Sequence, residues 1–305
     1  MQNFCSKGID SDTVVIREPR DGECGGTTET LDRKAPKEIS SHDIVLFTAE
    51  SALGFVSDDS DLTFVSAYAA PSDRGTFVYY EYANDFRSRG TKSDWAFIKE
   101  NASAALDALT VEQNFIADNG HFSKTHGLPE NFGGSVRIMY ASGETISFSD
   151  NQSPVFSLNT AKAIDRLFKK LLKKPRAALP DVETLKRIEF EETRKEGIFT
   201  RACLTVNPDG TALNKKQACY GDPKVYESEK PVDAETVRAI KENIRQSGIV
   251  AWPFLPEQSF IFSSEKTLRL VFAGGEEITV PANKLTPDRP GNAFFNIELE
   301  LVTKH

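Results

Sequence analysis

Apolar and polar residues alternate along several short stretches of the chain, which is the pattern of half-buried β-strands. In the first half these stretches are rich in β-branched and aromatic residues, which favour strands. The pattern predicts antiparallel sheets in both halves. The predicted strands are 43–47, 62–68 and 76–82, followed by 187–190, 199–206 and 212–220.

Other stretches place apolar residues on one helical face. A first helix is predicted from Trp95 to Leu109, with residues 91–94 resembling a capping box. A second contains Val237, Ile240 and Ile244. Its predicted ends are an Asp233 cap and Gly248.

The end of each half follows a different pattern. Residues 163–172 predict an amphipathic helix that ends before Pro175. Residues 296–301 alternate with a period of two and predict a strand.

The chain also repeats itself. Residues 137–146 and 269–278 match at a constant offset, and both predict β-hairpins. Ser142-Gly143 and Gly274-Gly275 fit two-residue turns. We therefore predict an α+β fold of two tandem β-β-β-α-β-β units, whose antiparallel sheets each pack with a helix. The alternative is two unrelated α+β domains that share common hairpin chemistry.

The two-residue turns fix an expected register for each hairpin. Ile138 and Leu270 are expected to be almost fully buried, whereas Ser147 and Thr279 are expected to be more exposed. The expected cross-strand partners are Met139 with Ile146 and Val271 with Ile278.

Changes of composition suggest three segments. Residues 1–38 show no persistent period and are expected to be a loosely ordered tail. Residues 173–181 read as a linker between two units. The expected units are therefore 39–176 and 177–305.

Residues 39–44, the helix after them, and residues 135–148 form a pattern that resembles an uncharacterised family of proteins from Gram-positive gut bacteria. The resemblance covers residues 39–172 and implies no catalytic residue. The family pattern has Trp-Asp-Gly just after the helix, where this chain has Val-Glu-Gln-Asn at 111–114. Trp252 holds the comparable place in the second unit.

Charge and hydropathy narrow the class of protein. The chain has 305 residues, 45 of them acidic and 37 basic, for a net charge of −8. The excess of acidic residues argues against a nucleic-acid partner. No apolar run is long enough to span a membrane, and the first residues do not resemble a signal peptide. A cytoplasmic protein is expected.

The four cysteines are expected to be free thiols. A hairpin turn at 207–210 pairs Cys203 with Lys215 and Cys219 with Phe199. The two sulfurs are then too far apart along the ladder for a disulfide.

Sequence motifs for common enzyme classes are absent, and no cofactor or metal is predicted. Asp118, His121 and His126 offer zinc-type ligands, but their spacing suits a surface loop better. Residues 57–61 are acidic without the EF-hand spacing, which favours a solvated loop over a calcium site.

Aromatic residues are the most informative class. Phe77 and Tyr79 point to one face of a predicted strand, and Tyr80 and Tyr82 point to the other. Either this strand is covered on both faces, or Tyr80 and Tyr82 belong to a recognition surface. Together with Trp252, these two tyrosines are the candidate binding residues.

The sequence favours a non-enzymatic, duplicated binding or interaction module, whose partner is a protein, a peptide or a small molecule. The alternative is an enzyme with a pocket between the two repeats that uses scattered acidic and histidine residues, such as Asp118 with His121.

Overall fold

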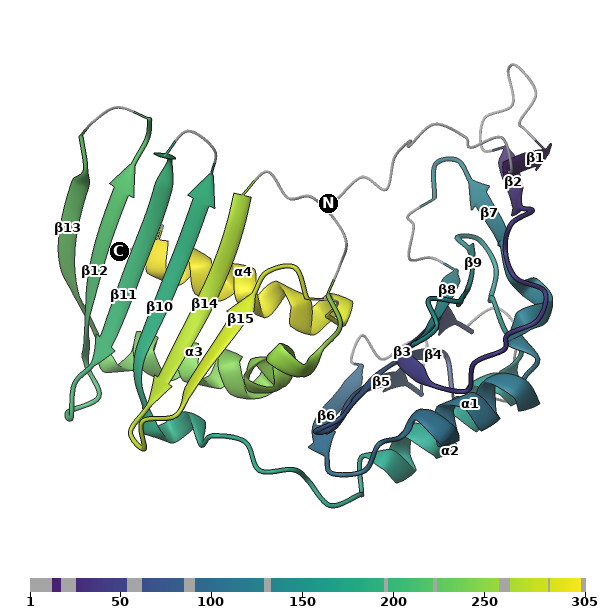
Figure 1. The fold of residues 1–305 in the computed structure, drawn as a ribbon, viewed down its shortest axis with the longest axis horizontal. Helices are drawn as coiled ribbons and strands as arrows, with labels where there is room; N and C mark the ends of the chain where they lie inside the picture. Colours follow the sequence, from purple (N-terminus) through teal and green to yellow (C-terminus); the bar gives the residue numbers. More distant parts are fainter. Residues whose placement is uncertain are drawn as a thin grey trace. The chain divides into compact units, whose positions relative to one another are not determined.

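The computed structural model of the chain is shown in Figure 1. The chain divides into two compact units, Met1–Arg176 (unit 1) and Ala177–His305 (unit 2). The structure describes residues 13–17, 26–53, 62–84, 91–128, 133–194, 197–221, 224–257, 264–284 and 286–302.

Unit 1 is built on a sheet with the strand order β1-β2-β7-β9-β8-β3-β4-β5-β6. All neighbouring strands are antiparallel except β7 and β9, which are parallel. The strands are β1 (Thr13–Arg17), β2 (Thr27–Asp32), β3 (Ile44–Ala52), β4 (Phe64–Ser72), β5 (Gly75–Ala83), β6 (Lys92–Ile98), β7 (His121–Thr125), β8 (Gly134–Tyr140) and β9 (Thr145–Asp150). The helices are α1 (Ser103–Glu112), the short 3-10 helix η1 (Phe115–Asp118) and α2 (Leu158–Leu171).

The core of unit 1 lies between one face of this sheet and the two α-helices (Figure 1). Phe47 and Ile138 from the sheet meet Leu106 of α1 and Phe168 of α2, and all four are completely buried. The apolar face of α2 has the amphipathic spacing predicted from the sequence, so burial of that face holds the helix on the sheet.

Unit 2 has an antiparallel sheet with the order β13-β12-β11-β10-β14-β15. Helices α3 and α4 lie behind this sheet in Figure 1. The strands are β10 (Leu185–Arg194), β11 (Phe199–Val206), β12 (Ala212–Cys219), β13 (Tyr226–Val232), β14 (Ser264–Phe272) and β15 (Glu277–Pro281). The helices are the short η2 (Val182–Thr184), α3 (Ala234–Ser247), η4 (Ile249–Phe254) and α4 (Asp288–Val302).

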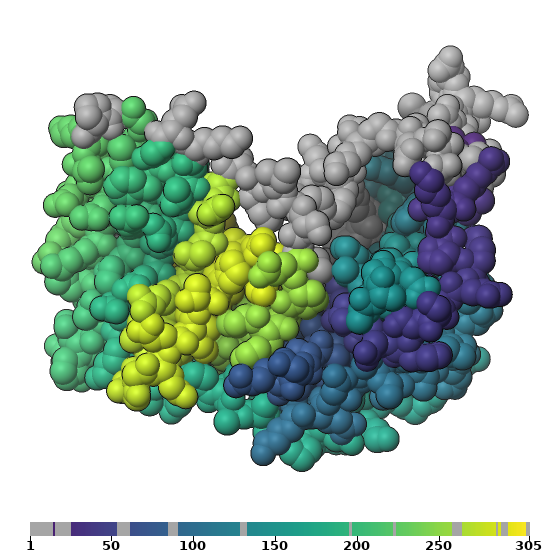
Figure 2. Space-filling view, viewed as in Figure 1, coloured from purple at the N-terminus to yellow at the C-terminus, as the bar shows by residue number. Residues whose placement is uncertain are grey.

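The other face of the unit 2 sheet is polar and is turned toward the viewer in Figure 2. Charged side chains pair across neighbouring strands, as in Arg201–Glu191 at 2.7 Å and Lys215–Glu229 at 2.9 Å. This alternation of buried apolar and exposed polar side chains is typical of an antiparallel sheet with one solvated face.

The two units share one order of elements. In each, a run of four strands (β3–β6 and β10–β13) is followed by an α-helix, a 3-10 helix, a hairpin and a last α-helix, and unit 1 has β1, β2 and β7 in addition. The sheet order β9-β8-β3-β4-β5-β6 of unit 1 is matched by β15-β14-β10-β11-β12-β13 in unit 2. Both first strands carry an irregularity of register at the same place, between Ile44 and Leu46 and between Leu185 and Arg187. The unit is therefore β-β-β-β-α-β-β-α, with one strand and one helix more than predicted.

The first predicted helix began too early. Residues 92–98 form β6, which pairs with β5, and α1 begins only at Ser103. Trp95 and Phe97 lie opposite Tyr79 and Phe77 of β5, so aromatic cross-strand pairing replaces the helical face. The sequence Ile-Lys-Glu-Asn occurs at both 98–101 and 240–243, but these positions are not equivalent, because Ile98 ends a strand and Ile240 lies within α3.

The predicted strand at 296–301 was also wrong, because these residues belong to α4. Ile297 and Leu301 are one helical turn apart and are both buried. Apolar residues at every second position include this spacing of four, so a short run fits either structure.

The predicted tail is not a loose segment where the structure describes it. β1 pairs with β2, and β2 pairs with β7 at the edge of the unit 1 sheet. Asp32 N–H donates to Gly120 O at 2.8 Å, which fixes the end of β2. The short apolar run around Val15 was therefore a strand signal.

The two matched hairpins have longer turns than predicted. Tyr140 N–H donates to Glu144 O at 3.0 Å, and Phe272 N–H donates to Glu276 O at 2.9 Å. Three residues thus separate the paired ends, and the third is a glycine with positive φ, 89° at Gly143. The additional turn residue shifts the register by one.

This shift changes the cross-strand partners but not the burial. Ile138 pairs with Ile146, and Leu270 pairs with Ile278, so the predicted partners Met139 and Val271 were wrong. Ile138 and Leu270 are completely buried, whereas Ser147 is half-buried and Thr279 is exposed. The predicted burial is confirmed.

Other sequence predictions are also confirmed. Cys203 pairs with Lys215 and Cys219 pairs with Phe199, and both cysteines are free thiols. Asp233 caps α3 by accepting a hydrogen bond from Thr236 N–H at 2.7 Å. Gly248 ends α3 in the left-handed conformation. Within the residues that the structure describes, no helix is long and apolar enough to cross a membrane.

Candidate interaction surface

Tyr80, the first candidate from the sequence, lies in the core of unit 1. Its side chain is 1 % exposed, and its ring packs against Phe168 at 5.7 Å between centroids. The hydroxyl donates to Asp165 at 2.7 Å. Burial, together with this hydrogen bond, raises the pKa of Tyr80 above its usual range. Tyr80 is thus a packing residue in the core of unit 1.

Tyr82 lies at the margin of the same cluster and is half-buried. Its ring stacks on Tyr80 with centroids 5.5 Å apart, and the ammonium of Lys169 lies 4.4 Å from the centre of its ring. Lys169 also pairs with Asp165 at 2.8 Å. These contacts tie β5 to α2.

The opposite face of β5 is buried as well. Phe77 and Tyr79 are 0 % and 4 % exposed, so the strand is covered on both faces. Tyr79 donates a hydrogen bond to the buried carboxylate of Glu81 at 2.8 Å. The rings on both sides of β5 are therefore buried in the structure.

Trp252 is also a core residue, in unit 2. It lies in η4, is 2 % exposed, and its indole N–H donates to Ser247 O at 3.3 Å. In this structure Tyr80 and Trp252 do not present their rings to solvent.

The acidic and histidine residues singled out in the sequence do not form a metal cluster. His126 contacts the hydroxyl of Thr28 at 2.8 Å, while Asp118 and His121 are exposed. Among the described residues, no group of three His, Cys, Asp or Glu side chains lies together. Residues 57–61 lie outside the described residues.

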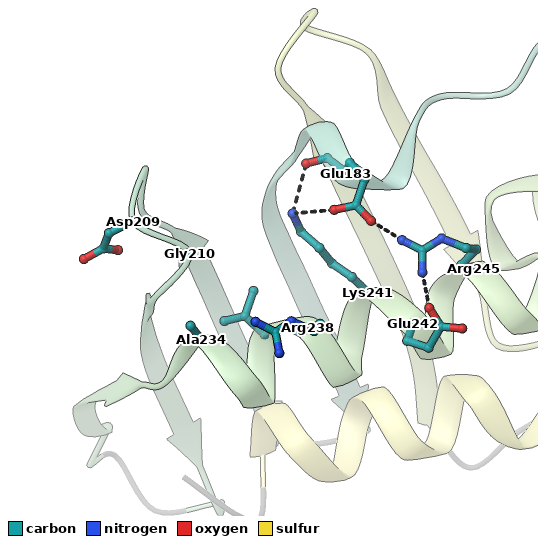
Figure 3. Close-up of a pocket in the computed structure, with 9 residues that line it drawn as sticks. Glu183, Asp209, Gly210, Ala234, Arg238, Lys241, Glu242 and Arg245 are labelled. Atoms are coloured by element: carbon teal, nitrogen blue, oxygen red, sulfur yellow. Dashed lines mark hydrogen bonds and ion pairs between the residues drawn. The ribbon is translucent and has the colours of Figure 1, made fainter.

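A shallow groove of about 420 Å³ lies on unit 2 between η2, the β11–β12 turn and α3 (Figure 3). Its charged lining residues are balanced, with three of each sign: Glu183, Asp209, Arg238, Lys241, Glu242 and Arg245. The pKa of Asp209 is lowered by hydrogen bonds from the hydroxyl and N–H of Thr211.

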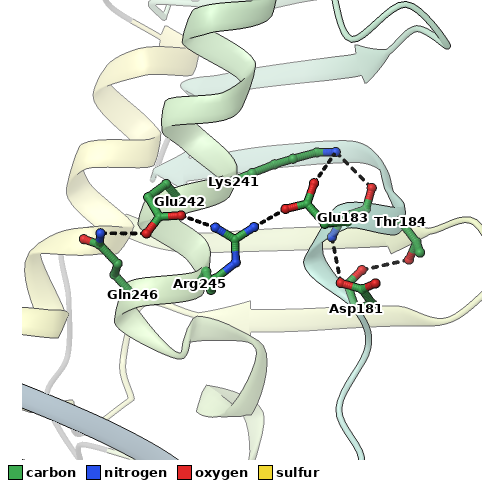
Figure 4. Close-up of polar contacts among 7 residues, drawn as sticks. All are labelled: Asp181, Glu183, Thr184, Lys241, Glu242, Arg245 and Gln246. Carbon is green, nitrogen blue, oxygen red and sulfur yellow. Dashed lines mark hydrogen bonds and ion pairs between the residues drawn. The ribbon is translucent and has the colours of Figure 1, made fainter.

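Most of these charges pair with one another (Figure 4). Lys241 donates to Glu183 O at 2.9 Å, and Arg245 joins the carboxylates of Glu183 and Glu242. Gln246 donates to Glu242 at 2.7 Å. This network holds α3 against the start of the sheet.

Unit 1 has a polar contact at the matching place, between α1 and the start of β3. The His42 ring contacts Asp107 of α1 at 2.8 Å, and Ser103, one turn earlier, donates to His42 O at 3.3 Å. In unit 2 the same roles fall to Glu183, Arg245 and Lys241. Because both units use this position to join a helix to the first strand, the groove network is structural.

A different surface of unit 2 presents aromatic residues to solvent. Tyr220, Val225 and Tyr226 are 63 %, 46 % and 43 % exposed. The two tyrosine rings lie 5.7 Å apart, and the Lys224 ammonium lies 4.9 Å from the Tyr226 ring centre. We call these four residues the Tyr220 cluster. They lie where β12 ends and β13 begins.

Sequence reasoning missed the Tyr220 cluster because β13 carries no apolar period, and six of its seven residues are exposed. The available signal was the pair of tyrosines on either side of Gly221 and Pro223, which form a turn-like sequence.

Comparison with known proteins gives no family. No protein-family model matches the chain, and no curated protein matches it.

Proposed function

We propose that the chain is a non-enzymatic binding module that recognises a peptide segment of another protein through the Tyr220 cluster. The observation that carries this proposal is the concentration of exposed aromatic surface at one end of unit 2. Three of the five large apolar side chains that are exposed among the described residues belong to this cluster.

Tyrosine suits such a role because it offers a large apolar surface and a polar hydroxyl at low entropic cost. Tyr220 and Tyr226 are held side by side by ladder pairing, since Tyr226 pairs with Ala218 on β12. The cluster is thus partly ordered before a ligand arrives, which reduces the cost of binding.

The positive charge of Lys224 favours a ligand that carries a negative charge. The Lys224 ammonium lies over the Tyr226 ring, so an apolar side chain next to a carboxylate would meet both a ring and a cation. The favoured ligand is therefore a peptide with an apolar residue beside Asp or Glu.

We also propose that the two units arose by duplication of one β-β-β-β-α-β-β-α ancestor. Support comes from the common strand order, the matching register irregularities in β3 and β10, and the matching turns at Gly143 and Gly275. In this view the Tyr220 cluster is a specialisation of the second copy.

A peptide-library selection on the immobilised full chain tests the binding proposal. Enriched peptides should carry the apolar–acidic pattern, and the double variant Tyr220→Ser, Tyr226→Ser should weaken their binding at least about tenfold. Val111→Ser is the matched control, because Val111 is 68 % exposed on α1 of unit 1.

Equal binding to the double variant, or no enrichment of any peptide, would overturn the proposal. Lys224→Glu adds a check on ligand charge, since it should weaken acidic peptides and favour basic ones.

A further inference from the structure

The outer edge of β15 offers main-chain groups for strand pairing. Phe272 and Glu276 form a hydrogen-bonded pair at the hairpin turn. Bonded and non-bonded pairs alternate along an antiparallel ladder. The peptide groups of Ile278 and Val280 therefore face β14, while those of Glu277, Thr279 and Pro281 face outward.

The matching edge in unit 1 is fully used. Asn119, which is 2 % exposed, accepts from Ser147 N–H at 2.7 Å and donates to Thr145 O at 3.2 Å. Gly120 N–H donates to Ser147 O at 2.9 Å. Beyond them β7 pairs with β9, followed by β2 and β1.

In the described part of unit 2 the cover is smaller: Glu257 bridges Lys284 just beyond the end of β15, and Lys284 donates to Leu255 O at 3.0 Å. Residue 255, the first after η4, is a leucine, which has no side-chain amide to bond the edge as Asn119 does in unit 1. Thr279 stands where unit 1 has Ser147, and it is exposed. Its main-chain N–H and C=O have no partner among the described residues.

We propose that β15 pairs with β15 of a second copy of this chain, antiparallel and in register about Thr279, to make one sheet continuous through two unit 2 domains. This inference concerns assembly and is independent of the peptide-binding proposal. It involves β15, at one edge of the sheet, whereas the Tyr220 cluster lies next to β13 at the other edge.

The register makes β15 self-complementary. Thr279 lies on the two-fold axis and exchanges both main-chain hydrogen bonds with Thr279 of the second copy. Ile278 faces Val280 of the second copy on the helix side, so apolar side chains meet. A register shifted by one residue would place the apolar side chains of one copy next to the solvated face of the other.

The charge and proline of the strand also suit this register. Glu277 is the one charged residue of β15, and it lies opposite Pro281 of the second copy and not opposite another glutamate. Pro281 has no N–H to donate, but its carbonyl can accept from Glu277 N–H. Because Pro281 cannot donate a hydrogen bond, it disfavours pairing of β15 with a longer strand or with a parallel strand. The proline therefore favours the antiparallel pair centred on Thr279.

Sedimentation of the full chain tests the proposal. The mass should rise with concentration from that of one chain toward that of two. Thr279→Lys should abolish the rise by placing two ammonium groups on the axis, and Thr279→Glu should do the same with carboxylates. An equimolar mixture of the two variants should restore a dimer.

Thr205→Lys is the matched control, because Thr205 is exposed on the interior strand β11. It should dimerise like the unaltered chain. A wild-type chain that stays monomeric up to millimolar concentration would overturn the proposal. Dimers of Thr279→Lys alone, or an equal loss in Thr205→Lys, would also overturn it.

Discussion

At the scale of single residues, depth and hydrogen bonding separate side chains that stabilise the fold from those that do not. Leu270 and Thr279 lie on neighbouring strands of one hairpin, yet Leu270 is fully buried and Thr279 is exposed. Glu144 is only half-buried, yet several donors surround its carboxylate. Burial and local hydrogen bonds therefore make different predictions.

Leu270→Ala should lower the free energy of unfolding by about 2–5 kcal/mol, because it leaves a cavity in the core of unit 2. Thr279→Ala should cost less than about 1 kcal/mol. Urea unfolding at low protein concentration, where the chain is monomeric, measures both. Equal costs would mean that the two side chains do not differ in burial as described.

Glu144 should make the stability of the fold depend on pH in the acidic range. Hydrogen bonds from Ser40 N–H and the Ser142 hydroxyl, with further help from Ser41, lower its pKa from 4.5 to about 2. A lowered folded-state pKa gives stabilisation that is complete above the unfolded pKa and is lost as the pH falls from about 4.5 toward 2. The melting temperatures of wild type and Glu144→Gln should therefore converge over this range. A constant difference down to pH 2 would argue against these hydrogen bonds.

At the scale of elements, turns set the register and buried runs set the strands. The three-residue turns at 141–143 and 273–275 each place a left-handed glycine at the third position. Glycine adopts this conformation without the clash of a Cβ atom. The turn thereby determines which residues of the hairpin face each other.

Gly275→Ala should cost about 1–2 kcal/mol, since φ is +83° there and alanine strains in that region. Gly274→Ala is a control in the same turn, because its φ is not positive and a Cβ atom would meet nothing within 4 Å. Thermal unfolding of the two variants should differ clearly. Similar losses would show that the positive φ at Gly275 is not what requires a glycine there.

The elements also show which parts of the fold can be predicted from the sequence. β11 and β12 were predicted with the help of the turn sequence between them, and the two ends of α3 were predicted from their capping residues. β13 could not be predicted, because an exposed edge strand needs no apolar period. α4 could not be separated from a strand, because Ile297 and Leu301 satisfy both patterns.

The candidate site was harder to predict than the fold. Tyr80 and Trp252 were chosen for their aromatic rings, but a ring in a strand or helix is as suitable for a core as for a surface. Only the tertiary structure shows that Tyr80 is covered while Tyr220 is not.

At the scale of the whole molecule, the two units share one order of neighbouring strands and differ in what is added to it. Unit 1 extends its sheet with β7, β2 and β1, whereas the described sheet of unit 2 ends at β15. The N-terminal strands are therefore part of unit 1, and their removal should affect this unit alone.

A chain that begins at Ile39 should unfold at a lower temperature in unit 1. It loses β2, and with it the bond that Asn119 donates to Pro36 O at 2.9 Å. The two tryptophans report separately, since Trp95 lies in unit 1 and Trp252 in unit 2. The Trp95 transition, followed in a Trp252→Phe background, should move down. The Trp252 transition, followed in Trp95→Phe, should not, and a shift of both would show that the N-terminal strands stabilise both units.

The hydrogen bonds around Asn119 also control how fast its side chain deamidates. An Asn-Gly sequence loses ammonia when the glycine nitrogen attacks the side-chain amide carbon and closes a cyclic imide. Here the Gly120 N–H is engaged by Ser147 O, and the Asn119 amide is bonded to Pro36 and Thr145. Ring closure must break this edge of the sheet first. Deamidation of Asn119, measured by peptide mapping of stored samples, should therefore accumulate with the time that unit 1 has spent open, and the aspartate and isoaspartate products would record the history of the sample.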